Sequence, residues 1–471
     1  MNVYSIRVSS FDSFNVDSLH PSANAFLPCL TEVDLSNSSM TKKGFEDVCN
    51  SLKVNSSVTK IILNNNLIDV NGADLIAKVL KLNSFLIEID LNYNSIGDDG
   101  AVAIAHGLTK NSSVKIISLR NNSIGPTGAI AIAETLKINS SIFRIDLTGN
   151  NIGQEAAIAI AEALTINSTL VELFLGNNAI ETDDVIDLAN ALESNSSIAI
   201  LDLQSNHFGR DGAIAIAETL KVNNVLTELY LGFTPIGVHG VIAIANGLKL
   251  NSSLTKLDLQ SVDFGPEGAM TVADFLKVNS SITVLNLTDN GLGNEGMISI
   301  SASLKVNSSI TELNLKCNDI GFEGATSLAN SLIDNCTITV LDLGHNTIGT
   351  KGAIFLAHSL KENSTLSEVN IADNDIGLDG VIEIALALKE NSSVNSLNLG
   401  YNSIGTKGAI EMGNALKVNC SVSKLSLNNC NIGSGFGSVI AEALTINTSL
   451  TKLDLSNNSI GAKVLLLWAM P

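Results

Sequence analysis

The stretch Val114–Ser141, VKIISLRNNSIGPTGAIAIAETLKINSS, contains the pattern that decides the fold. From Val114 to Leu119 apolar and polar residues alternate, which is typical of a short strand with one buried face. From Pro126 to Leu136 apolar residues recur every three or four positions, as on one face of a helix. Pro126 suits the first helical turn, because its missing N–H needs no partner there. The stretch therefore predicts one strand followed by one helix.

The end of this predicted helix carries two polar residues. Lys137 lies where the helix dipole favours a cation, and Asn139 is predicted to end the helix in a left-handed backbone conformation. Ile130 and Ile138 lie outside the inward-facing stripe. We expect neighbouring helices to cover both side chains.

The same 28-residue unit recurs along nearly the whole chain. Sixteen copies begin at Leu30 and follow one another without insertion or deletion, and the last is cut short at Pro471. All sixteen have an aliphatic residue at each of the three strand positions, and all fifteen complete copies have Asn at the position of Asn139. A fixed period with strand and helix in each unit indicates a solenoid, since no single copy can bury its own apolar face.

This unit resembles the leucine-rich repeat of the ribonuclease-inhibitor-like subfamily, which reads L-x-x-L-x-L-x-x-N-x-I-G and contains a full helix. The resemblance covers residues 30–471 and implies an α/β solenoid, a horseshoe with a parallel sheet on its concave face and helices on its convex face. The family's Asn is expected to form a ladder that satisfies backbone groups in successive loops. It is present as Asn66, Asn94, Asn122, Asn150, Asn178, Asn206, Asn290, Asn318, Asn346, Asn374, Asn402 and Asn458, and is replaced by Ser38, Thr234, Val262 and Cys430.

Residues 1–29 do not match the repeat and are predicted to cap the open N-terminal end of a single repeat domain at residues 30–471. The other end, around Trp468, has no polar cap in the sequence. Either these residues fold back as a minimal cap, or the chain is a fragment of a longer protein.

Composition narrows the classes of partner and compartment. The chain is 45% apolar, yet no run approaches the ~20 residues of a membrane-spanning helix, and we expect no membrane partner. Its net charge of −20 argues against nucleic acid and favours a basic partner. Six scattered cysteines and the lack of a basic-apolar N-terminal signal favour a reduced, cytoplasmic protein. We expect it to be a monomer. Asn-x-Ser/Thr glycosylation sequons occur in many copies, for example at Asn111 and Asn139. They are weak evidence for secretion, because copying one turn sequence produces them in successive repeats.

The strand positions that face the concave side are predicted to be acidic overall. Such a face is either a solvated sheet surface or a surface complementary to a basic partner. The position between the last two strand aliphatics is never basic. It is occupied by Asp34, Asp90, Asp146, Asp202, Asp258, Asp342 and Asp454 in seven copies.

Three aromatic residues stand out on this predicted face, because aromatics make up only 4% of the chain. Aromatic anchors surrounded by charge are typical of protein interfaces. The alternative is drift of a copied unit. The candidate partner-binding residues are Phe174, Tyr230 and Phe233 with the acidic residues Glu172, Asp202, Glu228 and Asp258.

One column of residues could be read as catalytic. Stacked strands would place Cys317, His345 and Asp373 in a row about 5 Å apart, as for a nucleophile, base and acid or a mixed metal site. A straight, open row lacks the convergent geometry that catalysis needs, so we expect no catalytic residue, metal or cofactor. Lysines near the helix ends, such as Lys137, have a sufficient local cause in the helix dipole.

The sequence therefore predicts a non-enzymatic scaffold that binds a protein partner through its concave face. The resemblance implies the same, because the sensor regions of NOD-like receptors use similar repeats to bind proteins or other ligands. A regulator of a small GTPase is an alternative, since the Ran GTPase-activating protein also looks like an array of these repeats. A repeat fragment of a NOD-like receptor and an enzyme using Cys317 and His345 are remote alternatives.

Overall fold

The computed structural model describes residues 4–7 and 30–461. The chain forms two compact units, Met1–Thr234 and Pro235–Pro471, and each is described by itself. Of the cap predicted at residues 1–29, residues 1–3 and 8–29 lie outside the described residues, as does the predicted C-terminal cap around Trp468.

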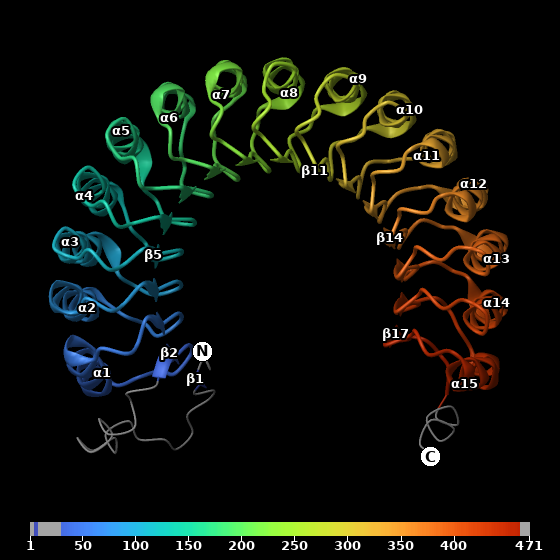
Figure 1. Ribbon diagram of the computed structural model, residues 1–471, viewed down its shortest axis with the longest axis horizontal. Coiled ribbons are helices and arrows are strands. Elements are labelled where there is room, and N and C mark those ends of the chain that lie inside the picture. The colour runs from blue at the N-terminus through green and yellow to red at the C-terminus, as the bar shows by residue number, and fades with distance from the viewer. Residues whose placement is uncertain (1–3, 8–29, 462–471) are drawn as a thin grey trace. The chain divides into compact units, whose positions relative to one another are not determined.

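In the first unit strands and helices alternate along the chain. Each strand pairs in parallel with the strand of the preceding copy, and Figure 1 shows the strands on the inner side of this unit's arc and the helices on its outer side. Strand β1, which precedes the repeats, pairs in parallel with β2. The elements are β1 (Tyr4–Arg7), β2 (Leu30–Asp34), α1 (Lys42–Val54), β3 (Lys60–Ile62), α2 (Val70–Leu82), β4 (Glu88–Asp90), α3 (Gly97–Leu108), β5 (Ile116–Ser118), α4 (Pro126–Leu136), β6 (Arg144–Asp146), α5 (Gly153–Leu164), β7 (Glu172–Phe174), α6 (Thr182–Ser194), β8 (Ile200–Asp202), α7 (Arg210–Val222) and β9 (Glu228–Tyr230).

The second unit repeats the same arrangement, with parallel strands on the inner side of its own arc. Its elements are α8 (Gly237–Leu248), β10 (Lys256–Asp258), α9 (Gly265–Leu276), β11 (Val284–Asn286), α10 (Gly293–Leu304), β12 (Glu312–Asn314), α11 (Phe322–Asp334), β13 (Val340–Asp342), α12 (Gly349–Glu362), β14 (Glu368–Asn370), α13 (Gly377–Leu388), β15 (Ser396–Asn398), α14 (Gly405–Leu416), β16 (Lys424–Ser426), the 3-10 helix η3 (Ser434–Phe436), α15 (Gly437–Ile446) and β17 (Lys452–Asp454).

Strand register follows directly from the constant repeat length. Arg144 pairs with Glu172 and Asp146 with Phe174, so equivalent positions of neighbouring copies lie side by side. In β7 the central Leu173 is buried and both outer residues are partly exposed. We call the rows formed by the first and third residues of the three-residue strands the first and third strand rows. Both rows face away from the core, because side chains alternate along a strand.

The Asn ladder predicted from the sequence is confirmed. The Nδ2 of Asn150 donates to the carbonyl oxygens of Leu119 at 3.0 Å and Leu147 at 2.8 Å. Its Oδ1 accepts the backbone N–H groups of Asn122 and Ile124, both at 3.0 Å. One amide thus satisfies backbone groups of two successive copies, which sharply turning loops cannot pair locally.

Three of the four substituted copies keep part of this bonding. The Ser38 hydroxyl donates to the Leu35 carbonyl at 2.6 Å, and the Thr234 hydroxyl donates to an equivalent carbonyl. The Cys430 thiol points at the Leu399 carbonyl at 3.3 Å. Val262 is buried and has no polar side-chain atom to offer.

The predicted role of Asn139 as a left-handed helix end is wrong. Asn139 is not among the residues with positive φ, and Asn55 and Asn195 at the equivalent position have φ of −73° and −69°. Instead the Asn139 Nδ2 donates to the carbonyls of Leu108 and Asn111, while its Oδ1 accepts the N–H groups of Ser141 and Ile142.

This position therefore forms a second Asn ladder, at the opposite end of the strands. Because every complete copy has Asn at this position, the sequence indicated one common role for it. A residue that ends the helix would explain the Asn as well as a ladder residue does. Only the contacts between copies distinguish the two.

The expectation that neighbouring helices cover Ile138 is also wrong, since this side chain is 70% exposed. Helix α4 ends at Leu136, so Ile138 lies beyond the region where helices pack against each other. Ile130 is partly exposed on the helix itself. Pro126 begins α4 as predicted.

The interior is closely packed. Between α6 and α7 it encloses a void of about 10 Å³, which is at the lower limit for one water molecule. Within residues 4–7 and 30–461, no helix has the length and apolar character needed to cross a lipid bilayer.

Candidate functional site

The third strand row alternates carboxylate and aromatic side chains across four neighbouring strands of the first unit. Asp146, Phe174, Asp202 and Tyr230 follow one another in register from β6 to β9. Strands are spaced about 4.8 Å apart, which places Phe174 and Tyr230 about 10 Å from each other. The two aromatic side chains are partly exposed, whereas Asp146 and Asp202 are buried. The row thus offers two aromatic surfaces separated by one buried acid.

An arginine holds the first aromatic side chain in place. The Arg144 guanidinium carbon lies 4.7 Å from the centre of the Phe174 ring, and the same side chain forms an ion pair with Glu172 at 3.5 Å. A cation over an aromatic face contributes about 0.5–2 kcal/mol. Glu172 is therefore not an isolated acid, because its charge is compensated by the residue beside it on β6.

The contact of Arg144 with Phe174 was not predicted from the sequence. The signal was available, because the 28-residue register places Arg144 next to Glu172 and close to Phe174. What the sequence could not give was the rotamer that carries the guanidinium over the ring.

The second aromatic side chain is held by an acid on its own strand. The Tyr230 hydroxyl donates a hydrogen bond of 2.6 Å to Glu228 Oε2. Both residues point to the same face of β9, since they are two positions apart. A hydrogen bond to a carboxylate is about twice as strong as one between neutral groups, so the Tyr230 ring is fixed in orientation.

The predicted acid Asp202 has a structural role at the end of its strand. Its Oδ1 accepts the backbone N–H of Gln204 at 2.9 Å, and its Oδ2 accepts from the Gln204 side chain at 3.2 Å. Asp258 in the second unit accepts the N–H of Gln260 in the same way at 2.8 Å.

Asparagine makes the same contact where it replaces aspartate in this row, as in Asn286 and its bond from the Thr288 N–H. The acidic character of the third strand row therefore has a local cause. A residue with an acceptor oxygen is needed where the strand ends, and Asp and Asn both supply it.

Phe233 lies outside this row. It follows β9 in the turn, has a φ of 58° and is 52% exposed. The structure therefore brings Phe174 and Tyr230 into one row and places Phe233 beyond its edge, three residues after Tyr230 in the same unit. Asp258 belongs to the second unit and is described only there.

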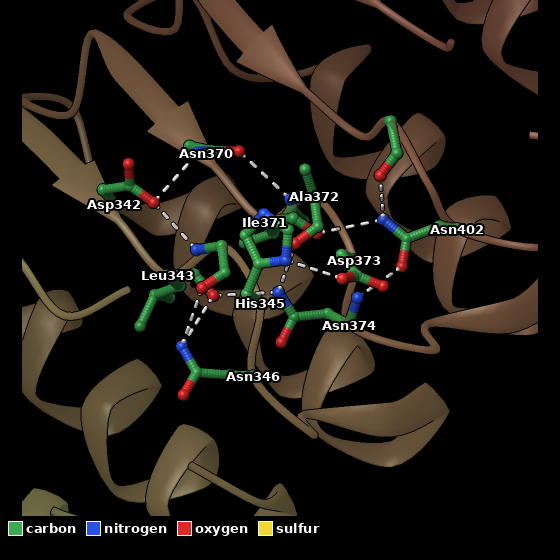
Figure 2. Close-up of polar contacts among 12 residues, drawn as sticks. Asp342, Leu343, His345, Asn346, Asn370, Ile371, Ala372, Asp373, Asn374 and Asn402 are labelled. Atoms are coloured by element: carbon green, nitrogen blue, oxygen red, sulfur yellow. Dashed lines mark hydrogen bonds and ion pairs between the residues drawn. The ribbon is translucent and has the colours of Figure 1, made fainter. Parts of the chain in front are cut away.

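The column that suggested catalysis contains a pair of residues rather than a triad. His345 Nδ1 lies 2.6 Å from Asp373 Oδ2, and both side chains are about half exposed. Figure 2 shows the two side chains pointing toward each other. Burial raises the pKa of the Cys317 thiol, which is opposite to what a nucleophile requires. Across residues 4–7 and 30–461 no cluster of three or more His, Cys, Asp or Glu side chains is arranged to hold a metal ion.

The histidines outside this column are also surface residues where the structure describes them. His106, His207, His239 and His358 are all exposed. His20 lies outside the described residues.

Comparison with solved structures found a partial likeness to one named "Leiomodin-1 Actin-Binding Site 2 (ABS2)". The two are 26% identical, the match covers 30% of this chain and 82% of that one, and the TM-score is 0.27. At this TM-score the likeness carries no argument. A search of curated proteins found no match.

A family model described as "Leucine Rich repeat" matches twelve segments that together make up more than half of the chain. They are residues 82–105, 110–133, 139–161, 194–217, 222–245, 250–273, 278–301, 306–329, 334–357, 362–385, 390–413 and 447–463. These segments fall in register with the strand and helix copies of both units. The chain therefore belongs to the leucine-rich repeat family.

Proposed function

We propose that this protein is a non-catalytic scaffold that binds a protein partner through the exposed strand rows of its first unit. Leucine-rich repeat proteins are typically interaction scaffolds, and their domains generally bind protein partners. The observation that carries the proposal is the pair of partly exposed aromatics, Phe174 and Tyr230, each fixed by a charged neighbour.

Fixed aromatics are suited to binding because little side-chain freedom remains to be lost. Ordering a mobile side chain at an interface costs about 0.5–1.5 kcal/mol. Arg144 and Glu228 reduce this cost for the two rings before any partner arrives. Phe233 extends the same surface into the turn, where its ring is half exposed.

The proposed partner is basic. In the first strand row Lys60 and Arg144 form ion pairs with Glu88 at 3.0 Å and Glu172 at 3.5 Å, so these four charges cancel. The third strand row supplies carboxylates and no cation in the first unit. Together with a net charge of −20, this favours a positively charged partner and faster association with it.

The proposal extends to the subfamily and the compartment. A 28-residue unit with a full helix supports the ribonuclease-inhibitor-like subfamily. The sequon residue Asn139 is buried and uses its Nδ2 group in two hydrogen bonds, which disfavours a glycosylating compartment and supports the cytoplasm. We propose a monomer, because nothing in this binding mode requires a second copy.

The test compares wild type with the double variant Tyr230→Ala/Phe233→Ala. Proteins captured by wild type and not by the variant are identified by mass spectrometry, and the affinity of each is measured by surface plasmon resonance. Truncating central aromatic anchors typically costs 2 kcal/mol or more, so we expect binding at least ~30-fold weaker. Glu228→Lys should mainly slow association.

Glu134→Lys and Glu218→Lys on the helical side are the matched controls and should leave affinity unchanged. Full affinity in the aromatic double variant, or loss of binding in these controls, would place the interface elsewhere. A panel of GTP-loaded small GTPases is tested in parallel. Faster phosphate release from any of them would favour the GTPase-regulator alternative instead.

A further inference from the structure

A group of large apolar side chains projects from one edge of the first unit, where each helix ends and the next strand begins. We call it the edge patch. Its members lie in the segments 81–87, 137–143 and 165–171, at equivalent places of the repeat. They are Leu82, Phe85, Ile87, Ile138, Phe143 and Ile166, with exposures of 66%, 47%, 40%, 70%, 39% and 62%.

Taken together, four successive segments along this edge carry lysine and no acid. Segments 81–87, 109–115, 137–143 and 165–171 contain four lysines and neither Asp nor Glu, in a chain whose net charge is −20.

The four lysines differ in whether their charges are compensated. Lys137 forms ion pairs with Glu134 and Glu162. Lys81, Lys110 and Lys115 are exposed and form no ion pair with any residue of 4–7 or 30–461.

Local structure does not explain this combination. The helix dipole favours Lys81 in the last turn of α2, but Lys110 and Lys115 lie beyond α3 and gain little from it. The Phe85 and Phe143 rings are 47% and 39% exposed and lie outside the buried core. Apolar side chains grouped on a surface and surrounded by charges mark a binding site.

We propose that the edge patch binds the surface of an anionic phospholipid bilayer. Repeats without insertions place equivalent residues along one side of the unit, so the apolar side chains protrude together from an edge. Aliphatic and Phe side chains can then enter the interfacial layer, while Lys81, Lys110 and Lys115 lie at the level of the lipid phosphates. An acidic protein would share the charge complementarity, but protruding side chains along several copies suit a planar partner better.

This inference concerns contact with a membrane surface and no spanning helix. The expectation of no membrane partner followed from the length of apolar runs, and lysines near the helix ends, such as Lys137, were explained by the helix dipole. Lys110 and Lys115 lie beyond the end of α3, where this explanation does not apply. The edge patch is separate from the strand rows proposed to bind a protein, so either proposal can fail alone.

The test uses the full chain and vesicles of phosphatidylcholine with about 30% phosphatidylserine, compared with vesicles of phosphatidylcholine alone. Binding is measured by cosedimentation at about 0.1 M salt. The variant Lys81→Glu/Lys110→Glu/Lys115→Glu should partition at least roughly 100-fold less to anionic vesicles, because each lysine near such a surface contributes about fivefold. Phe85→Ser/Phe143→Ser should bind at least about tenfold less and keep its melting temperature, because both rings are exposed.

The control Lys249→Glu/Lys277→Glu/Lys305→Glu makes the same change in net charge in the second unit, with all three lysines at the repeat position of Lys81. There the following strands begin beside Thr255 and Thr283 rather than beside Ile87 and Phe143. It should retain most of the binding. Failure of wild type to bind anionic vesicles, equal binding to neutral vesicles, or an equal loss in this control would overturn the proposal.

Discussion

At the scale of single residues, the turn after each strand requires a left-handed backbone, and all sixteen copies within the described residues adopt it at one position. This conformation costs most residues about 1–2 kcal/mol, and Gly and Asn least. Gly or Asn accordingly occupies the position in seven copies, as Asn37, Asn65, Asn121, Gly149, Asn177, Asn429 and Asn457. Phe233 adopts the same conformation, with a φ of 58°, although it is unfavourable for a Phe residue. Tyr93 and Tyr401 occupy the equivalent position with φ of 55° and 58°, so three copies have an aromatic residue in this conformation.

Phe233→Asn should therefore raise the free energy of unfolding by about 1 kcal/mol while weakening partner binding. The reverse change, Asn177→Phe, should lower stability by a similar amount, since Asn177 occupies the same turn with a φ of 53°. Urea unfolding measures both variants. A destabilised Phe233→Asn would show that the ring contributes to the fold rather than to binding alone.

The ladder residues are the second case at this scale. Asn150→Ala and Asn290→Ala should each destabilise the protein by roughly 1–3 kcal/mol, because backbone groups of two copies lose their partners. Val262→Asn is the control and should cost far less, since it restores the residue type that other copies have. Unchanged thermal unfolding in both alanine variants would contradict the role assigned to the ladder.

At the scale of the strand, aspartates of the third strand row share one structural role but have differently shifted pKa values. The third strand row needs an oxygen that accepts the backbone N–H two residues later, as Asp90 does for Asn92 at 2.9 Å. Burial raises the pKa of Asp90, and the neighbouring Glu88 carboxylate acts in the same direction. At Asp454 the Ser456 hydroxyl and N–H lower the pKa instead. Asp90 and Asp454 therefore accept the same kind of hydrogen bond, but the pKa of the first is raised and that of the second is lowered.

These pKa shifts predict opposite results for the same substitution. The Asp90 carboxylate destabilises the fold at pH values above its raised pKa, so Asp90→Asn should increase stability at pH 7, with a gain that shrinks as the pH falls toward ~4. The Asp454 carboxylate stabilises the fold above its ordinary pKa, so Asp454→Asn should lower stability at pH 7. Both asparagine substitutions keep a side-chain oxygen that can accept the backbone N–H two residues later. Urea unfolding between pH 7 and about pH 4 is the measurement, and shifts of equal sign would show that charge is not the cause.

At the scale of each unit, two Asn ladders run along opposite ends of the strands and join successive copies. The second ladder contains the sequons. Asn139 is 7% exposed and its Nδ2 donates to two carbonyls of the preceding copy. A sugar on that nitrogen would remove a donor and require space that the packed copies do not leave. Folding and glycosylation at this position therefore exclude each other.

A soluble N-glycosyltransferase should leave Asn139 of the folded protein unmodified. A synthetic peptide of residues 132–146, which contains the same sequon without its neighbours, should be modified under the same conditions. Mass spectrometry reads both reactions. Modification of the folded protein at the rate of the peptide would show that the second ladder opens readily, against its proposed role.

The sequence by itself determined the repeat, the order of strand and helix, the apolar face of each element and the first Asn ladder. These features follow from local periodicity and from a constant spacing of 28 residues, which fixes the neighbours of every position. The stacking of Arg144 on Phe174, the bond from Tyr230 to Glu228, the separate place of Phe233 and the exposure of Ile138 were decided only by the tertiary structure. They depend on side-chain rotamers and on where neighbouring helices stop covering one another. The repeat pattern contains no information on these contacts, because each of them occurs in a single copy or at an edge and does not recur with the 28-residue period.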